Sequence, residues 1–442
     1  MCGFIAGKNI DRDLSKYIEE MKWRGLPGFE GYLKFKKSKM YLEDQEFQFA
    51  HVSLPMSNLD PLKAIQPVMI GDNPNLFVGE IFNYKNFGDY ATDQEACSDL
   101  FWKEGLDFFH NFDGFWSFIS VIDGEMIGVT DYLAQKPIYY REDIEILASE
   151  IDVLRGFGPV TPNKLFLSNV MKWGYDPLGN TPWNEIKMVP PGHYYHGGEI
   201  KKYWDWSRIK PGNLREDLLR AVNLRLGGER DVPILLSGGL DSSIIYGLIK
   251  ESGRDIKALH VENGEASFAE MVCNDLVKVS LSDVGDREAI AIHQSPVDLG
   301  SVKPQIAMAR KLRELGFYTV LTGDGADELF GGYRRAKEYD SQHSDVFCEL
   351  PYYHLPKLDR TMMRSTIELR APFLAPSIIA YALNLPWNER NGIKKVLVET
   401  FGDIVPQKIL DRTKRPLKTE DIRMNPLESR KKNLEIWRDI NE

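Results

Sequence analysis

The chain has little cysteine, a deficit of positive charge and no long apolar run, and each shortage excludes a class of protein. Its four cysteines, Cys2, Cys97, Cys273 and Cys348, form neither a metal-binding spacing nor a disulfide framework, so we expect a cytoplasmic protein. The net charge of −10 argues against nucleic acid as the main partner, because phosphate neutralisation needs a basic surface. No apolar run is long enough to cross a bilayer, which predicts that no membrane is a partner.

What the sequence does contain divides into two patterns along its 442 residues. Up to about residue 155, short apolar segments separated by turn residues predict many strands, with the clearest helix over Asp93–Gly105. Residues 156–206 are rich in proline and glycine and are predicted to be a connector with short elements of secondary structure. Beyond them, helices alternate with the apolar segments "VPILL", "IKALHV" and "YTVLTG", which is typical of a parallel α/β sheet. We therefore expect domains at 2–155 and 207–442.

The segment "SGGLDSS", Ser237 to Ser243, has the composition of an anion-binding site. Its two glycines let the backbone turn sharply and approach a ligand. Ser242 and Ser243 fall where a helix would begin, so free N–H groups and the positive end of the helix dipole point at the turn. Asp241 beside an anion indicates a divalent cation, since Mg²⁺ is commonly held by carboxylates together with phosphate oxygens. The alternative is an ordinary turn in which the hydroxyls cap the helix.

Cys2 would be the first residue of the chain after removal of the initiator methionine. A terminal cysteine carries a thiol and an α-amine, and the amine titrates near neutrality, so it can act as the base for its own thiol. Cys2 is therefore a candidate nucleophile that needs no histidine. The alternative is a cysteine that stands at position 2 by chance.

Further motifs give both ends of the chain a family resemblance. With Cys2, the segments "RGLPG", "GEIFNY", "DGFWSF" and "ASEIDVL" resemble the glutaminase half of class II amidotransferases. The segments "SGGLDSS", "TGDGADELFGGY" and "DRTMMRSTIELRAPFL" resemble the synthetase half of glutamine-hydrolysing asparagine synthetases, which is of the ATP-pyrophosphatase type. The resemblance covers nearly the whole chain, although the chain is shorter than typical members. It implies an α/β protein: an α+β N-terminal αββα sandwich of the Ntn-hydrolase kind, followed by a C-terminal α/β domain with a parallel sheet.

The resemblance implies a carbon–nitrogen ligase with glutamine, aspartate and ATP as substrates and Mg²⁺ as a cofactor. Aspartate would be activated as β-aspartyl-AMP, and ammonia released from glutamine at Cys2 would pass through the protein and displace AMP. Dimers built through the N-terminal domain are frequent in the family, so a homodimer is open to this chain.

In the C-terminal half, the resemblance assigns the ATP and metal sites. The residues that match ATP-binding positions are Leu235, Ser237, Gly238, Gly239, Asp241, Ser242, Ser243, Val261, Thr322, Gly323 and Lys394. Asp241 and Asp327 match the magnesium-binding acids, and Asp324 is placed to handle a proton during amide formation. Glu368 and Arg370 match a family Glu-x-Arg that holds the loop beneath the site, although a plain ion pair of Arg370 is an equal alternative. Lys414 matches a second family lysine.

In the N-terminal half, the resemblance implies a glutamine site with two departures from the family. Cys2 and Gly79 match the nucleophile and an oxyanion-binding N–H, and Glu80 and Asp93 match residues that bind the substrate amine. Ser53 replaces the arginine that grips the glutamine carboxylate, and Arg24 is the candidate to supply the missing charge. Val78 replaces an asparagine of the oxyanion hole, a kind of loss that costs about a hundred- to a thousand-fold in rate.

Three interpretations therefore remain open from the sequence. The first is asparagine synthesis with glutamine as the nitrogen donor. The second retains amide synthesis but uses free ammonia or a different carboxylate; an acid at Asp324, where lactam-forming relatives carry tyrosine, points away from ring closure. The third is a non-catalytic scaffold that binds nucleotide, which the presence of both Asp241 and Asp327 disfavours.

Overall fold

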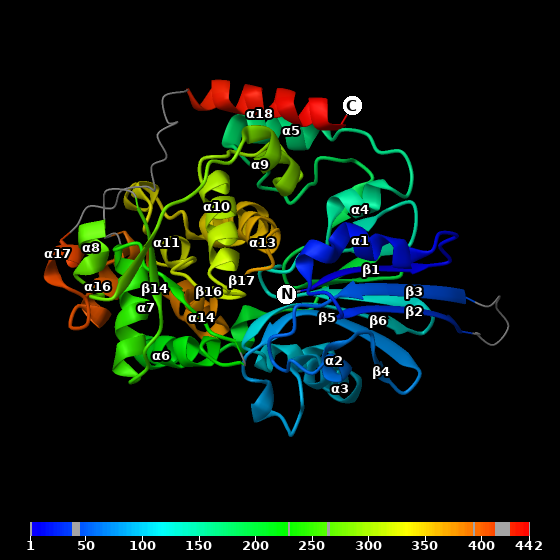
Figure 1. Ribbon diagram of the computed structural model, residues 1–442, viewed down its shortest axis with the longest axis horizontal. Helices are drawn as coiled ribbons and strands as arrows, with labels where there is room; N and C mark the ends of the chain where they lie inside the picture. The colour runs from blue at the N-terminus through cyan, green and yellow to red at the C-terminus, as the bar shows by residue number, and fades with distance from the viewer. Residues whose placement is uncertain are drawn as a thin grey trace.

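The computed structural model describes residues 2–37, 45–228, 230–262, 266–391, 394–411 and 425–441. Two antiparallel sheets form the N-terminal half (Figure 1). The first has the order β10 (Ile186–Met188), β8 (Tyr139–Arg141), β9 (Ile146–Ala148), β1 (Gly3–Lys8), β3 (Gln45–Val52) and β2 (Glu30–Lys37). The second has the order β12 (Glu199–Lys202), β11 (His193–His196), β7 (Glu125–Thr130), β6 (Gly114–Ile122), β5 (Asn73–Ile81) and β4 (Val68–Ile70).

The two N-terminal sheets pack face to face through an apolar core. Phe4 of β1 and Phe49 of β3 share this core with Val78 of β5 and Ile119 of β6. The helices α1 (Ile18–Met21) and α4 (Ile151–Arg155) cover the first sheet, and α2 (Pro61–Ala64) and α3 (Asp93–Glu104) lie on the side of the second (Figure 1). This is the αββα arrangement that we expected.

Local sequence explains why α3 forms where we predicted a helix. The Thr92 hydroxyl accepts a hydrogen bond from the Glu95 N–H, and the Glu95 carboxylate accepts one from Ala91, which is a capping box. Gly105 ends the helix with φ +76°, a conformation that glycine adopts without steric cost. The predicted helix is therefore confirmed.

Residues 156–206, which we expected to connect two domains, contribute strands to both N-terminal sheets. Strand β10 pairs with β8 in the first sheet, and β11 pairs with β7 in the second. Turn-forming glycines such as Gly197 (φ +55°) separate these short strands, so the composition resembles that of a linker even though strands β10, β11 and β12 are paired. The proline and glycine content of this segment gave no indication that its strands pair with the sheets.

The C-terminal half is built around a parallel sheet, as the alternating pattern predicted. Its order is β15 (Leu276–Val279), β14 (Ala258–Val261), β13 (Ile234–Leu235), β16 (Thr319–Leu321) and β17 (Glu368–Arg370), and each neighbouring pair is parallel. The helices along the rest of the chain are α5 (Lys164–Trp173), α6 (Leu214–Arg225), α7 (Leu240–Glu251), α8 (Ala266–Glu270), α9 (Asp286–His293), α10 (Val302–Glu314), α11 (Ala326–Leu329), α12 (Gln342–Ser344), α13 (Leu355–Met363), α14 (Pro376–Leu383), α15 (Trp387–Arg390), α16 (Lys395–Phe401), α17 (Gln407–Leu410) and α18 (Pro426–Asn441).

The two halves share buried side chains rather than meeting at a thin contact. One apolar cluster runs from Trp116 of β6 to Ile244 of α7 and Phe373. The last helix, α18, packs on α5 and α9 at the top of the molecule (Figure 1). In the part of the chain that the structure describes, helices are too short or too polar to cross a bilayer.

Candidate active sites

The hinge "SGGLDSS" lies between β13 and the start of α7, as the sequence predicted. Gly238 has φ +73°, and the Gly239 N–H donates a hydrogen bond to the Ser237 hydroxyl at 3.2 Å. The hydroxyls of Ser237 and Ser242 lie 3.0 Å apart, so the turn is held by its own side chains. The first N–H groups of an α-helix have no acceptor within the helix, so those of α7 are directed at this turn.

The other expected ATP residues meet this hinge because the strands are parallel. Leu235, Val261 and Thr322 stand at the carboxyl ends of β13, β14 and β16, and such ends share one edge of a sheet. A Cβ atom at Gly323 would lie 2.8 Å from Cβ of Asp241, so the two loops are in close contact. The buried hydroxyls of Thr322 and Ser243 have no hydrogen-bond partner among the described residues, which favours a ligand that would pair them.

Lys394 bridges the two acids that we assigned to magnesium. Its ammonium lies 2.6 Å from both carboxylate oxygens of Asp241 and 2.6 Å from Oδ1 of Asp327. The lysine side chain is 4% exposed, and although burial disfavours the ammonium, the two carboxylates outweigh it and raise the pKa of Lys394 above its usual value. The site is therefore built to hold a cation.

The donor set fits Mg²⁺ when phosphate is also present. Within the described residues, the structure has no group of three or more His, Cys, Asp or Glu side chains placed to hold a metal alone. Asp241 and Asp327 nevertheless converge on one point, as their shared contact with Lys394 shows. Two carboxylates completed by phosphate oxygens and water are an ordinary Mg²⁺ site.

Asp324 follows Gly323 and lies near Lys357 of α13. Burial lowers the pKa of Lys357 to about 8, against the attraction of Asp324 and Glu328, which favours the charged form. Lys357 was not singled out by the sequence, because a lysine on a helix gives no sign of burial. Lys414, the second family lysine, lies outside the described residues.

Cys2 stands at the start of β1, nearly buried. Its Sγ lies 3.4 Å from the hydroxyl of Ser53, and burial raises the pKa of the Cys2 thiol. The imidazole of His51 on β3 is also buried, and burial lowers the pKa of His51 to about 3, so this ring is neutral at physiological pH. The thiol therefore lies beside the Ser53 hydroxyl, and the buried histidine of β3 carries no charge.

Gly79 is held where a side chain cannot fit. It has φ +137°, and a Cβ atom there would overlap the carbonyl oxygen of Phe115 on the neighbouring strand β6. The residue before it, Val78, packs in the apolar core between the sheets with Cys2. Position 78 therefore contributes packing, and Gly79 is the residue of the pair that lines the hollow beside Cys2.

The hollow beside Cys2 is small. Its volume is about 20 Å³, enough for roughly one water molecule. It is lined by Cys2, Ser53, Leu54, Pro55, Met56, Ser57, Asn58, Ala64, Gln66, Phe77, Gly79, Thr92, Asp93 and Gln94. A glutamine molecule is larger than this hollow, so the hollow would have to widen before glutamine could reach Cys2.

Of the two acids expected to bind the substrate amine, Asp93 lines this hollow. It accepts hydrogen bonds from the Ser57 hydroxyl at 2.7 Å and from the Ile81 N–H at 3.1 Å. Burial outweighs these bonds and raises the pKa of Asp93 to about 6. Glu80 points elsewhere: both of its carboxylate oxygens accept hydrogen bonds from Arg370, at 2.6 and 2.7 Å.

Arg24 does not supply the missing cation of the glutamine site, which differs from our expectation. Its guanidinium is 2% exposed and binds the carboxylates of Glu150 and Asp359, the latter at 2.6 Å. The two carboxylates outweigh the cost of burial and raise the pKa of Arg24. An arginine committed to two buried acids is not available to a substrate carboxylate. The sequence could not show this, because Asp359 lies 335 residues away.

Asp359 also binds Lys136, a residue that sequence reasoning missed. The Lys136 ammonium lies 3.0 Å from Asp359 and 3.3 Å from Glu368. Burial raises the pKa of Glu368 to about 7, against the attraction of Lys136. A buried network of ion pairs thus joins residues of the two halves.

A cysteine ahead of a two-sheet sandwich, joined to a parallel sheet with a glycine hinge, is the arrangement expected of a glutamine-dependent amidotransferase. Comparison with family models agrees with this class. A glutamine amidotransferase domain model matches residues 1–204, and an asparagine synthase model matches residues 213–347 and 339–434. The chain belongs to the asparagine synthase family, as its motifs indicated.

Individual proteins that the chain resembles are named as glutamine-hydrolysing asparagine synthetases. The chain is 25% identical over 417 residues to the root glutamine-hydrolysing asparagine synthetase of Pisum sativum, covering 80% of this chain and 68% of that protein. It is 26% identical over 405 residues to asparagine synthetase B of Escherichia coli, covering 76% and 68%. A solved glutamine phosphoribosylpyrophosphate amidotransferase from B. subtilis matches with a TM-score of 0.33 and 12% identity over 84% of this chain and 91% of that one, a likeness too low to support a conclusion.

Proposed function

We propose that the protein is an ATP-dependent ligase that makes asparagine from aspartate, with nitrogen taken from glutamine. The observation that supports this most is the convergence of Asp241, Asp327 and Lys394 beside the hinge at the start of α7. Helix N–H groups attract phosphate, and a buried lysine can offset charge that develops on it. Residues 207–442 would carry this chemistry.

In the proposed reaction, the β-carboxylate of aspartate attacks the α-phosphorus of ATP, which forms aspartyl-AMP and releases pyrophosphate. Ammonia then attacks the acyl carbon, which forms asparagine and releases AMP. The hinge and Lys394 would bind the phosphates. Asp324, on the loop after β16, would accept a proton from the attacking nitrogen.

Asp241 and Asp327 would hold Mg²⁺ in this site. When bound, Mg²⁺ neutralises charge on phosphate oxygens and so assists the departure of pyrophosphate. Lys394 now fills the space between the two carboxylates, so its ammonium would turn toward the phosphates when the metal enters.

Residues 2–155 would release ammonia from glutamine. The Cys2 thiol would attack the side-chain amide of glutamine and form a thioester as the C–N bond breaks and ammonia leaves, and water would then release glutamate and the thiol. The Gly79 N–H would stabilise the oxyanion, and Asp93 would bind the amine. The cytoplasmic location, the homodimer and the internal passage for ammonia stay predictions.

A second candidate function is amide synthesis from free ammonium. Three observations favour it: the small hollow beside Cys2, the pairing of Glu80 with Arg370, and the commitment of Arg24 to buried acids. Each weakens glutamine binding without touching the ATP site.

The test measures pyrophosphate and amino-acid products with ATP, Mg²⁺ and aspartate, supplying either glutamine or ammonium. The matched variant is Cys2→Ala. We expect glutamine-dependent asparagine formation by the wild type and only ammonium-dependent formation by Cys2→Ala. Activity with ammonium alone in the wild type would establish the second candidate. Absence of pyrophosphate with both donors would contradict aspartate as the acceptor.

A further inference from the structure

The proposed glutamine site needs a cation to bind the substrate carboxylate, and neither position 53 nor Arg24 can provide it. Ser53 stands where the family has arginine, and Arg24 binds Glu150 and Asp359. The hollow beside Cys2 is lined by no lysine or arginine among the described residues. A zwitterionic amino acid would therefore leave its carboxylate unpaired there, unless a cation reaches it from outside the hollow.

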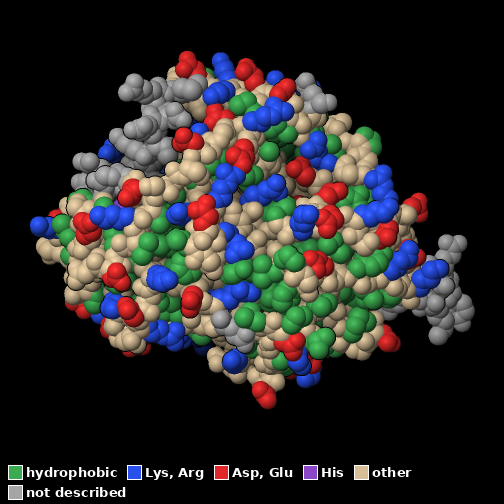
Figure 2. All heavy atoms as spheres, in the orientation of Figure 1, with side chains coloured by type: hydrophobic (Ala, Val, Ile, Leu, Met, Phe, Trp, Pro, Cys, Tyr) green, Lys and Arg blue, Asp and Glu red, His purple; other side chains and the backbone are tan. Residues whose placement is uncertain are grey.

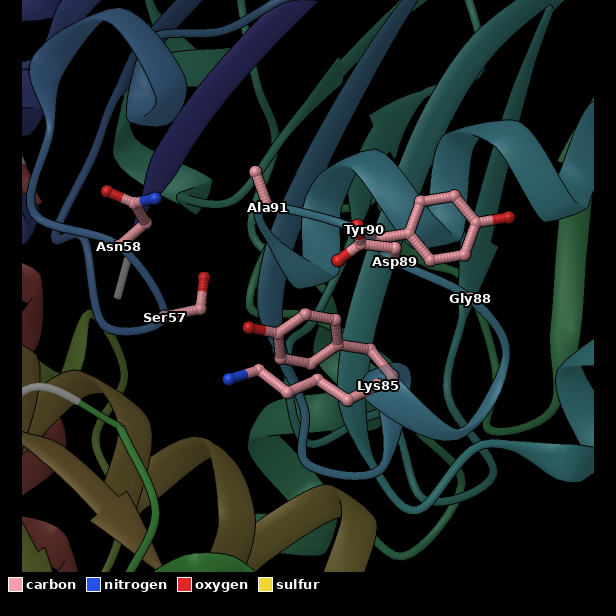
Figure 3. A pocket seen from close by; sticks show the side chains of 8 residues that line it. Ser57, Asn58, Lys85, Gly88, Asp89, Tyr90 and Ala91 are labelled. Atoms are coloured by element: carbon pink, nitrogen blue, oxygen red, sulfur yellow. The ribbon is translucent and has the colours of Figure 1, made fainter.

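A second, larger hollow opens directly beside the first. Its volume is about 580 Å³, and it is lined by Ser57, Asn58, Tyr84, Lys85, Gly88, Asp89, Tyr90 and Ala91 (Figure 3). Ser57 and Asn58 line both hollows, so the two spaces are separated by this short segment. The larger hollow is open to solvent, and Figure 2 shows one face of the molecule, on which charged and apolar side chains are mixed. A ligand that came in by the larger hollow would reach Cys2 past Ser57 and Asn58, and we call this hollow the entrance.

Lys85 is the cation that lines this entrance. Figure 3 shows its side chain extending from the ribbon toward Ser57. Its ammonium lies 5.8 Å from the centre of the Tyr84 ring, and it forms no ion pair with any described residue. The short 3-10 helix Tyr84–Asn86, whose first residue is buried, fixes the base of the side chain.

Asp89 lines the larger hollow together with Lys85, and Asp93 lines the smaller hollow. Figure 3 places Asp89 across the hollow from Lys85. Asp93, behind Ser57, faces the inner hollow. A lysine and carboxylates placed apart in this way match the carboxylate and the amine of a free α-amino acid, and they would favour it over a peptide or a neutral amide.

We propose that Lys85 binds the α-carboxylate of glutamine and so replaces the arginine that position 53 lacks. The inference rests on the proposed glutamine-dependent function and names the residue that sets its substrate specificity. An ammonium makes a single-point contact where a guanidinium makes a two-pronged one, so this site holds glutamine more loosely than an arginine site would. Lys85 acts in binding and takes no part in the chemistry at Cys2.

The experiment compares two ligands and three variants of the full-length protein. The ligands are L-glutamine and its α-carboxamide, which lacks the carboxylate charge. The variants are Lys85→Ala, Lys85→Arg and, as a matched control, Lys103→Ala, which removes a lysine that is 62% exposed on α3. Glutamate release gives kcat and KM, and calorimetry on the Cys2→Ala background gives binding without turnover.

We expect Lys85→Ala to raise KM for glutamine at least tenfold with kcat within twofold, and to leave the α-carboxamide unaffected. Lys85→Arg should keep KM within threefold, and Lys103→Ala should match the wild type. An equal loss for both ligands, or no loss for glutamine, overturns the proposal. If the wild type binds no glutamine, the proposal is also overturned. Asparagine formation from ammonium would then show that the synthetase reaction takes place without glutamine binding.

Discussion

Arg370 donates hydrogen bonds from Nε and Nη2 to the two carboxylate oxygens of Glu80, at 2.7 and 2.6 Å. Glu80 belongs to β5 of the N-terminal half, and Arg370 ends β17 of the parallel sheet. The glutamate is 5% exposed and the arginine 1%, so the pair is a two-pronged ion pair out of contact with solvent. It joins the strand that carries Gly79 to the sheet that carries the hinge.

Loss of Arg370 should therefore destabilise the whole molecule. Arg370→Ala leaves a buried carboxylate unpaired, and such changes cost about 3–5 kcal/mol. We expect a large fall in the midpoint of urea unfolding, measured by circular dichroism. Arg208→Ala is the matched control, because its ion pair with Asp107 is exposed and should contribute less than about 1 kcal/mol. Equal midpoints for the two variants would contradict a structural role for the Glu80 pair.

Gly79→Ala tests the close approach of β5 and β6. A methyl group at position 79 would meet the Phe115 carbonyl in a backbone conformation that alanine disfavours, so we expect a loss of about 1–3 kcal/mol or more in stability. Gly71→Ala provides the comparison, since Gly71 also has positive φ (+59°) but a methyl group there would have nothing within 4 Å of it. Thermal unfolding of both variants separates the cost of the overlap from that of the backbone conformation. A smaller loss at position 79 than at 71 would argue against the overlap.

The pH dependence of glutamine use should follow Asp93. Its raised pKa of about 6 means that the carboxyl becomes neutral as the pH falls through 6, and a neutral acid attracts the substrate amine less. We expect KM for glutamine to rise between pH 7 and pH 5, while KM for ammonium, corrected for its own protonation, shows no such step. Asp93→Asn should have a high KM at every pH and lose the step. A step that persists in Asp93→Asn would assign it to another group.

Sequence reasoning reached the fold because each half has a strong local pattern. Turn-separated apolar segments predicted the strands of the sandwich, and the alternation after residue 207 predicted the parallel sheet. At 156–206 it predicted a connector with short elements, but it gave no sign that β10 pairs with β8 and β11 with β7. Pairing partners far apart in sequence leave no local sign.

The same limit explains the candidate sites. The hinge and its neighbours could be predicted from motifs, since a strand, a glycine turn and a helix are contiguous. The partners of Arg24 and Glu80 could not, because Asp359 and Arg370 come from the other end of the chain. Lys85 gave no signal either, as an exposed lysine after a tyrosine is ordinary until a hollow is seen around it.

Lys394 is the residue whose replacement best separates metal binding from catalysis. Its ammonium contacts Asp241 and Asp327 at 2.6 Å, so it competes for the carboxylates that would bind Mg²⁺. Lys394→Met removes this competitor and should tighten Mg²⁺ binding in the absence of nucleotide at least fivefold, measured by calorimetry. The same variant should lose pyrophosphate release, because the charge that offsets the leaving phosphates is gone.

The control for Lys394→Met is Lys395→Met, since Lys395 is 48% exposed and pairs with Glu389 and Glu399 on the surface. It should change neither Mg²⁺ affinity nor pyrophosphate release by more than twofold. Chelation of Mg²⁺ should stop pyrophosphate release by the wild type. Weaker Mg²⁺ binding by Lys394→Met would mean that the lysine orders the two carboxylates for the metal and does not occupy the metal position. The role of the carboxylates in Mg²⁺ binding would then be tested separately with Asp327→Asn.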